Sequence, residues 1–205
     1  MNKDDVRGAM QEQNTIWNGY WTKKKRLIDY AKYTPTSRNT FRFLAALDLP
    51  SHAQVLDAGC GTGKLASFMQ SQGHCITGID LSDDALTITR AKGINAIKAD
   101  ILEGLPFEDR SFDLVYSDGL LEHFIDPKPV LVELSRLSRL HLLTFVPRIS
   151  LYATVAAALL KPPKEYKRQD SEWIDIHKVV LPSRAIRSRA IPFGLLAITC
   201  TMLNE

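Results

Sequence analysis

The chain has 205 residues, of which 45% are hydrophobic and 24% charged, and its formal net charge is +3 at pH 7. This length allows one well-buried core, and the composition is typical of a soluble globular protein. The weak positive charge does not favour nucleic-acid binding, and the apolar runs at 151–160 and 191–203 are shorter than the roughly 20 residues of a membrane helix, so both are expected to be buried elements.

The first residues and the cysteines indicate the compartment. Residues 1–13 are polar and charged, unlike a secretory signal. Cys60, Cys75 and Cys200 form no CxxC pair, which favours reduced thiols in a cytoplasmic protein, with Cys75 and Cys200 in the core. Because no HxxxH or CxxC spacing occurs, we expect no metal site.

The N-terminal segment, residues 1–50, has a helical and aromatic character and precedes the strand-forming region. Its rings Trp17, Tyr20 and Trp21 predict a helical lid that covers a ligand and its substrate. The alternative is a helix packed on the edge of the sheet. We therefore divide the chain into this lid and a domain over residues 51–205.

From Gln54 onward, strand-like and helix-like segments alternate. This pattern predicts an α/β fold: a doubly wound, mainly parallel, Rossmann-like sheet with helices on both faces. After Pro147 the alternation is lost, and residues 161–173 are expected to form an exposed loop or insertion. Strands are predicted over 54–59, 74–80, 94–100, 111–117 and 140–146, and helices over 63–73, 82–93 and 126–139.

Three glycines, Gly59, Gly61 and Gly63, follow the first predicted strand, which ends with an acid at Asp57. A phosphate-binding P-loop requires GxxxxGK[ST], and this loop lacks its first glycine and its final hydroxyl. A dinucleotide fingerprint requires GxGxxG, but the position of its third glycine holds Lys64. The loop therefore predicts a close backbone approach to a ligand other than a phosphate chain.

Two further acids suggest which ligand that is. Asp80 ends the second predicted strand, where a carboxylate can accept hydrogen bonds from a ribose diol. Asp100 ends the third, on the same edge of the sheet, where an adenine amine can be received. A ribose acceptor and an adenine acceptor without a phosphate cradle point to S-adenosylmethionine.

The segments VLDAGCGTG, GIDLS and KADILEGLPFEDRSFDLVYSDGLLEH resemble class I S-adenosylmethionine-dependent methyltransferases. The resemblance covers about residues 50–147 and is greatest to the type 11 group, which includes the ubiquinone/menaquinone C-methyltransferases. It departs from that group where a Pro-Gly-Gly turn before the fifth strand and a C-terminal Gly-Phe are missing. The resemblance implies cofactor-binding roles for Asp57, Ala58, Gly59, Cys60, Gly61, Gly63, Asp80, Leu81, Asp100, Ile101, Ser117, Asp118 and Gly119.

The predicted function is methyl transfer from S-adenosylmethionine to a small-molecule acceptor by in-line displacement. His123 is a candidate general base, with a structural histidine as the alternative, and Glu122 is expected to brace its loop. Two other functions stay open: a nucleic-acid methyltransferase on the same fold, and a non-catalytic module that binds the cofactor. The segment from Ser117 to Leu120 does not resemble the Asn-Pro-Pro-Tyr motif of adenine methylation.

Overall fold

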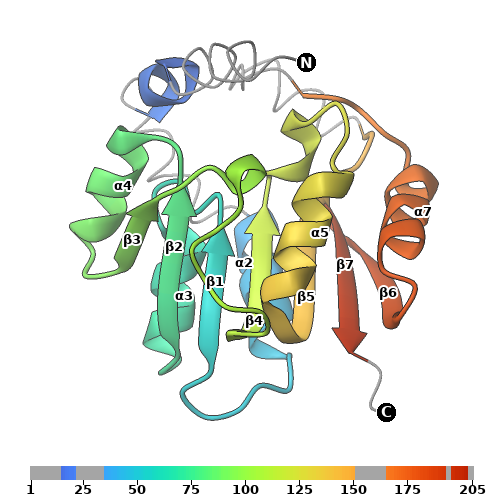
Figure 1. Ribbon diagram of the computed structural model, residues 1–205, viewed down its shortest axis with the longest axis horizontal. Helices are drawn as coiled ribbons and strands as arrows, with labels where there is room; N and C mark the ends of the chain where they lie inside the picture. Colours follow the sequence, from blue (N-terminus) through green and yellow to red (C-terminus); the bar gives the residue numbers. More distant parts are fainter. Residues whose placement is uncertain (1–14, 22–34, 151–164, 193–194, 203–205) are drawn as a thin grey trace.

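A seven-stranded sheet with strand order β3-β2-β1-β4-β5-β7-β6 forms the centre of the computed structural model (Figure 1). The structure describes residues 15–21, 35–150, 165–192 and 195–202. Its elements are α2 Pro35–Ala45, β1 Gln54–Ala58, α3 Lys64–Ser71, β2 Cys75–Asp80, α4 Asp83–Arg90, β3 Asn95–Lys98, η1 Ile101–Glu103, β4 Phe112–Asp118, η2 Leu121–His123, α5 Lys128–Leu137, β5 Ser138–Pro147, α7 Asp170–Val180, β6 Arg184–Ile191 and β7 Leu195–Met202.

The first five strands run parallel, and β7 is antiparallel to both of its neighbours, β5 and β6. The chain passes outward from β1 to β3 and then returns to form β4 on the other side of β1. The strand order thus reverses between β1 and β4, at the position where open α/β sheets bind ligands. The predicted doubly wound, mainly parallel sheet is confirmed.

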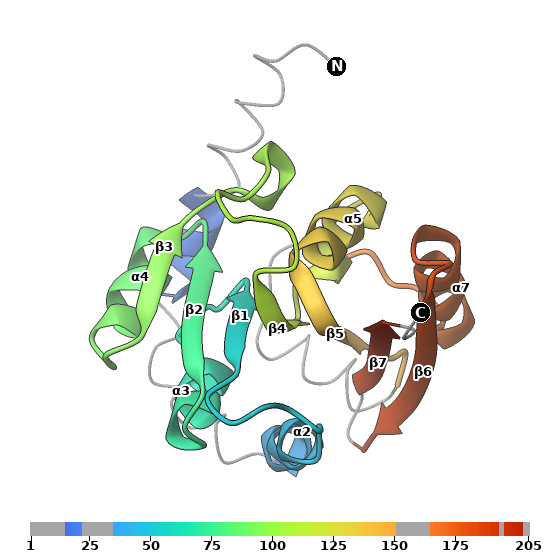
Figure 2. The ribbon, with the colours of Figure 1, turned by 60° about the horizontal axis from the view of Figure 1, so that its bottom comes forward.

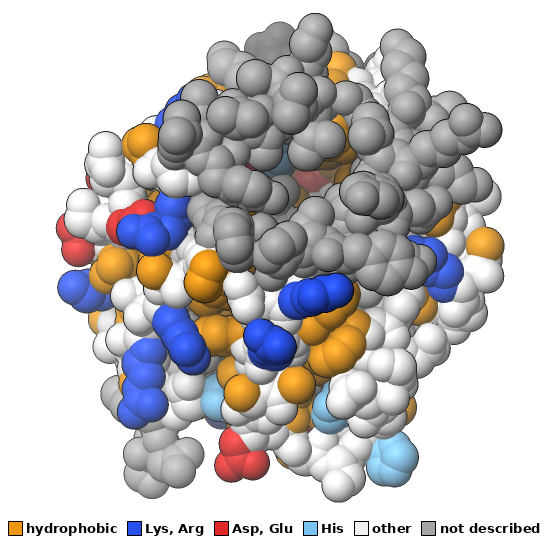
Figure 3. All heavy atoms as spheres, turned by 180° about the vertical axis from the view of Figure 1, so that it is seen from behind, with side chains coloured by type: hydrophobic (Ala, Val, Ile, Leu, Met, Phe, Trp, Pro, Cys, Tyr) orange, Lys and Arg blue, Asp and Glu red, His pale blue; other side chains and the backbone are white. Residues whose placement is uncertain are grey.

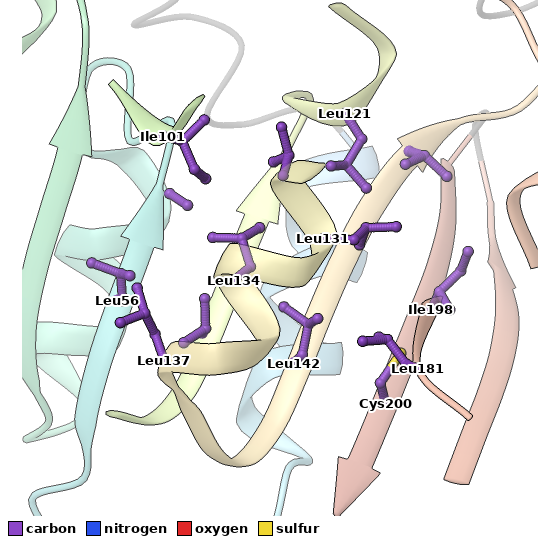
Figure 4. Close-up of a cluster of buried hydrophobic side chains, with 14 of the residues drawn as sticks. Leu56, Ile101, Leu121, Leu131, Leu134, Leu137, Leu142, Leu181, Ile198 and Cys200 are labelled. Carbon is purple, nitrogen blue, oxygen red and sulfur yellow. The ribbon is translucent and has the colours of Figure 1, made fainter. Parts of the chain in front are cut away.

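Helices cover both faces of this sheet, as Figure 2 shows. Neighbouring strand residues alternate between two apolar clusters, so that Leu56 packs with α5 and α7 while Val55 packs with α2 and α3. On α5, the side chains of Leu131, Leu134 and Leu137 lie in the same cluster as Leu56 (Figure 4). Figure 3 shows the opposite side of the molecule, where Lys and Arg side chains are interspersed with apolar ones.

The chain connects α5 to β5 without the Pro-Gly-Gly turn that is typical of the family it resembles. The helix ends at Leu137 and the strand begins at Ser138. Arg184, which is 7% exposed, donates from its guanidinium to the carbonyl oxygens of Ser135 at 3.0 Å and Ser138 at 2.8 Å. A side chain from β6 therefore adds hydrogen bonds at this helix end, where the Ser135 carbonyl also accepts from the N–H of Ser138.

Two expectations need correction: the exposed loop over residues 161–173 and the burial of Cys75. Within 161–173, α7 begins at Asp170 and Trp173 is fully buried, because its ring packs in the cluster beneath α5. Cys75 is exposed at the start of β2, whereas Cys200 is buried as expected. In the N-terminal segment, α2 packs its apolar side on α3 and the sheet.

Other expectations lie partly beyond the described residues. The apolar run at 151–160 falls outside them. The run at 191–203 contains β7, in which four of the eight residues are buried. Of the predicted lid over residues 1–50, the structure describes residues 15–21 and 35–50, and residues 15–21 form a short helix near the ends of β2 and β3 (Figure 2). Among the helices of the described residues, none is long and apolar enough to cross a membrane.

Candidate active site

Aspartates end three of the parallel strands on one edge of the sheet. Asp57 is the fourth residue of β1, Asp80 is the last of β2, and Asp118 is the last of β4; Asp100 follows β3 by two residues. A cavity of about 680 Å³ opens at this edge, and all four aspartates line it. The sequence predicted that Asp80 and Asp100 share this edge, because the carboxyl ends of parallel strands meet there.

The glycine loop forms one side of the cavity and is hydrogen-bonded to the end of β2. The backbone N–H groups of Gly59 and Cys60 both donate to the carbonyl oxygen of Ile79 at 2.9 Å. Gly61 donates its N–H to Oδ2 of Asp80 at 2.8 Å, and its own carbonyl accepts from the Thr89 hydroxyl at 2.8 Å. The loop is therefore fixed in position by neighbours on two other elements.

Asp80 has a second partner on the next helix. Its Oδ1 accepts from the N–H of Ser82 at 2.9 Å, while the Ser82 hydroxyl caps α4 as the sequence predicted. Burial raises the pKa of Asp80, although hydrogen bonds from the backbone N–H groups of Ser82, Gly61 and Leu81 oppose that shift. A carboxylate offers about four lone-pair sites, so Asp80 keeps acceptor capacity toward the cavity.

Asp100 and Asp57 have different surroundings. Asp100 caps η1 by accepting from the N–H of Leu102 at 2.8 Å, and burial raises its pKa. Asp57 is 3% exposed. Burial raises its pKa to about 7, and the nearby charges of Asp118 and Asp80 add to that rise. The negative potential of this edge suits a ligand that carries positive charge or donates hydrogen bonds.

Most of the residues predicted for the site come together around the cavity. Ala58, Gly63 and Ser117 do not line it, and Ser117 is fully buried in β4. Burial raises the pKa of the Cys60 thiol, which argues against a nucleophile there. The predicted residues that do line the cavity are Trp17, Tyr20, Trp21, Asp57, Gly59, Cys60, Gly61, Asp80, Leu81, Asp100, Ile101, Asp118, Gly119 and His123.

The helical segment over residues 15–21 lies against the glycine loop and α4. Asn18 accepts from the Ser82 hydroxyl through its side-chain oxygen at 2.6 Å. Trp21 packs on Gly61 so closely that a Cβ at that glycine would lie 2.8 Å from its ring. Trp17 meets the His123 ring edge to face, with ring centroids 4.8 Å apart. The three aromatic residues chosen from the sequence therefore do reach the cavity.

A segment just before α7 forms the opposite wall, which the sequence analysis missed. The N–H of Tyr166 donates to the carbonyl oxygen of Glu122 at 2.7 Å. Arg168 donates to the carbonyl of Ile125 at 2.6 Å and packs over the Trp173 ring at 4.8 Å. Glu165 and Tyr166 thereby line the cavity. No local signal marks them, because they lie in the charged run that was expected to be exposed.

Glu122, which was expected to brace its loop, is a buried residue of that loop. It is 4% exposed, and among the described residues its Oε2 has no hydrogen-bond partner. Burial raises its pKa to about 8. Glu122 and His123 both line the cavity.

Comparisons with known proteins agree with this geometry. Residues 56–140 match the family described as a methyltransferase domain. A malonyl-[acyl-carrier protein] O-methyltransferase from Pectobacterium atrosepticum is 36% identical over 115 residues, which cover 54% of this chain and 44% of that protein. A ubiquinone biosynthesis O-methyltransferase from Thiobacillus denitrificans is 38% identical over 90 residues, covering 41% of this chain and 39% of that protein.

A solved structure extends the likeness along most of the fold. Magnesium protoporphyrin IX methyltransferase from Synechocystis PCC 6803 with bound SAM matches with a TM-score of 0.68 at 15% identity, over 95% of this chain and 97% of that one. This chain spans less than half the length of the two curated relatives. Over residues 56–140 the chain therefore matches a methyltransferase domain, and its fold is that of the solved methyltransferase structure.

Proposed function

We propose that this protein is a methyltransferase that moves the methyl group of S-adenosylmethionine to a small-molecule acceptor. One observation carries the proposal: a single cavity joins the glycine loop and the acids Asp80 and Asp100 to a second wall formed by η2 and Glu165. The first part suits an adenosine cofactor, and the second leaves room for another molecule beside it. The methyl-transfer activity of the relatives supports the same function.

In this proposal the cofactor lies along the carboxyl edge of the sheet. Asp80 accepts from the ribose hydroxyls, Leu81 and Ile101 contact the adenine, and Asp100 receives its amine. The methionine part passes over Gly59 and Gly61, next to Asp57. Asp118 and Gly119 then lie nearest the sulfonium, where a carboxylate would stabilise the positive charge.

The chemistry requires few catalytic groups. A nucleophile on the acceptor would attack the methyl carbon in line with the sulfur. The carbon–sulfur bond would break, and its electron pair would stay on the sulfur of the demethylated cofactor. The protein contributes by aligning the two molecules and excluding water. His123, which lines the cavity next to Trp17, is the proposed acceptor of the proton that the nucleophile loses.

Residues 15–21 are proposed as a lid over this reaction. Their rings Trp17, Tyr20 and Trp21 supply apolar area above the cofactor, and Asn18 attaches them to the cap of α4. Water competes with the acceptor as a nucleophile, so covering the cavity protects the transfer.

The test has two stages that separate this proposal from its rivals. Calorimetry should show binding of S-adenosylmethionine and of its demethylated product. The protein is then incubated with methyl-labelled cofactor and a mixture of small metabolites, and separately with DNA and RNA. Label in a small molecule supports the proposal, label in nucleic acid favours the first rival, and binding without any transfer favours the non-catalytic module. Absence of cofactor binding would overturn all three.

A further inference from the structure

Glu122, His123 and Glu165 bring their side chains together on the acceptor side of the cavity. One carboxylate or ring-nitrogen atom from each lies within 4.8 Å of those of the other two. Glu165 is 43 positions from Glu122 in the chain, and the hydrogen bond from Tyr166 N–H to the Glu122 carbonyl holds the two segments together at 2.7 Å. The cluster is therefore built by a backbone contact between distant segments.

The burial of Glu122 points to a missing cationic ligand. With 4% of the residue exposed, and Oε2 without a partner among the described residues, a negative charge on this carboxyl group would lack a cationic partner there. Burial raises the pKa of Glu122 to about 8, and the like charges of Glu165 and Asp118 add to it. Among the described lining residues, Lys64 is the one lysine or arginine, and its charge acts on Asp118. A buried carboxylate normally has a counter-charge.

The span of the cluster indicates what kind of cation fits. An ammonium group donates in tetrahedral directions to oxygens at about 2.8 Å, which places those acceptors about 4.6 Å apart. Ligands of a zinc-like ion, with bonds of about 2.1 Å, would lie only about 3.0–3.4 Å apart. The distances between the atoms of this cluster, which are at most 4.8 Å, admit an ammonium group.

The aromatic rings of Trp17 and Tyr20 lie beside this cluster. Trp17 packs against His123 with ring centroids 4.8 Å apart, and against Tyr20 at 5.6 Å. The pKa of Tyr20 is raised by burial and, secondly, by the charge of Glu165, so its hydroxyl lies within the field of that carboxylate. Aromatic faces attract cations, and the attraction is greatest where water is excluded.

We propose that the methyl acceptor carries a protonated amine, which binds between the carboxylates of Glu122 and Glu165 beneath Trp17 and Tyr20. This inference rests on the proposed methyl-transfer function and names the substrate class. An acceptor with a carboxylate at this position would instead be repelled by the charge of Glu165, and it could not compensate a charge on Glu122. The pocket thereby selects among small molecules by charge.

The test uses three probes of one shape: phenethylammonium, 2-phenylethanol and 3-phenylpropionate. Each is titrated into the full chain saturated with S-adenosylhomocysteine at pH 7.5, where the amine is protonated. We expect the ammonium to bind about tenfold or more tightly than the alcohol, and the carboxylate to bind least. The variants Glu122→Gln and Glu165→Gln should each remove most of that preference without changing the affinity for the alcohol.

A matched control keeps the net-charge change but avoids the cavity. Glu103→Gln alters an exposed acid on η1 that does not line the cavity, and it should leave the ammonium preference unchanged. Equal binding of the three probes, or no binding of any, would overturn the inference. Tight binding of Mn²⁺ alone that Glu122→Gln abolishes would also overturn it, because the cluster would then be a metal site. Failure of S-adenosylhomocysteine to bind would instead refute the proposed function.

Discussion

Replacing Asp80 with alanine is the sharpest test of where the cofactor lies. In the proposed complex this carboxylate accepts from the ribose hydroxyls, and a hydrogen bond to a charged acceptor contributes about 1.5–3 kcal/mol. Asp80→Ala should therefore weaken binding of S-adenosylhomocysteine about 10- to 150-fold. The structure shows that the same variant also removes the acceptor of the Gly61 and Ser82 amides.

That second effect has to be measured separately. Two backbone donors lose their partner in Asp80→Ala, and each unsatisfied buried donor costs about 1–3 kcal/mol unless water replaces the carboxylate. Urea unfolding of the ligand-free variant gives this loss. Asp80→Asn keeps one side-chain oxygen for a single amide, so its stability should lie between those of the alanine variant and the wild type.

Calorimetric titration with S-adenosylhomocysteine is the assay, performed at a temperature where every variant is folded. Asp83→Ala is the control: this neighbouring acid pairs with Lys98, and both side chains are exposed. Exposed ion pairs contribute at most about 1 kcal/mol, so the control should bind as the wild type does. If Asp80→Ala also binds like the wild type, the ribose assignment is wrong, whatever its effect on stability.

Three other predictions concern the frame around the site. Burial lowers the pKa of His177 to about 4, below its usual value near 6.5, so its contribution is complete above pH 6.5 and is lost as pH falls toward 4. The loss should reach about 3 kcal/mol, and urea unfolding from pH 7.5 to 4.5 should show a smaller loss in His177→Gln. Arg184→Met should lower the free energy of unfolding by about 2–5 kcal/mol because it removes buried hydrogen bonds to two carbonyl groups, whereas Arg187→Met, exposed on the same strand, should change it by less than about 0.5 kcal/mol. Hydrogen exchange over residues 15–21 should slow when S-adenosylhomocysteine is added; exchange that is already slow and unaffected by ligand would identify a structural edge helix.

The central part of the fold could be predicted because each element there carries its own local signal. Short apolar strands end at acids, and Ser82 and Gly73 mark the ends of helices as expected. The C-terminal third lacks such signals. In β6 four consecutive residues are exposed, so the strand has no alternating pattern, and Trp173 is buried despite the charged residues around it.

The candidate site divides in the same way. Asp80 and Asp100 could be found because their positions follow from the strands that end there. Glu165 could not, because its place depends on the backbone hydrogen bond from Tyr166 to Glu122, a contact between segments far apart in the chain. The acceptor side of the site is therefore the part that required the structure. It is also the part from which the substrate class is inferred.

The three glycines of the loop have three separate structural causes, although they form one motif. All have positive φ, yet a Cβ at Gly59 would meet Leu120 at 3.1 Å, while one at Gly61 would meet Trp21 at 2.8 Å. At Gly63 it would meet Thr89 of α4 at 2.8 Å, and this glycine does not line the cavity. The third glycine thus allows α4 to pack against the start of α3, and the second allows the proposed lid to lie on the loop. Packing within the protein would therefore require glycine at Gly61 and Gly63 even without a cofactor. Cofactor binding directly explains only part of the motif.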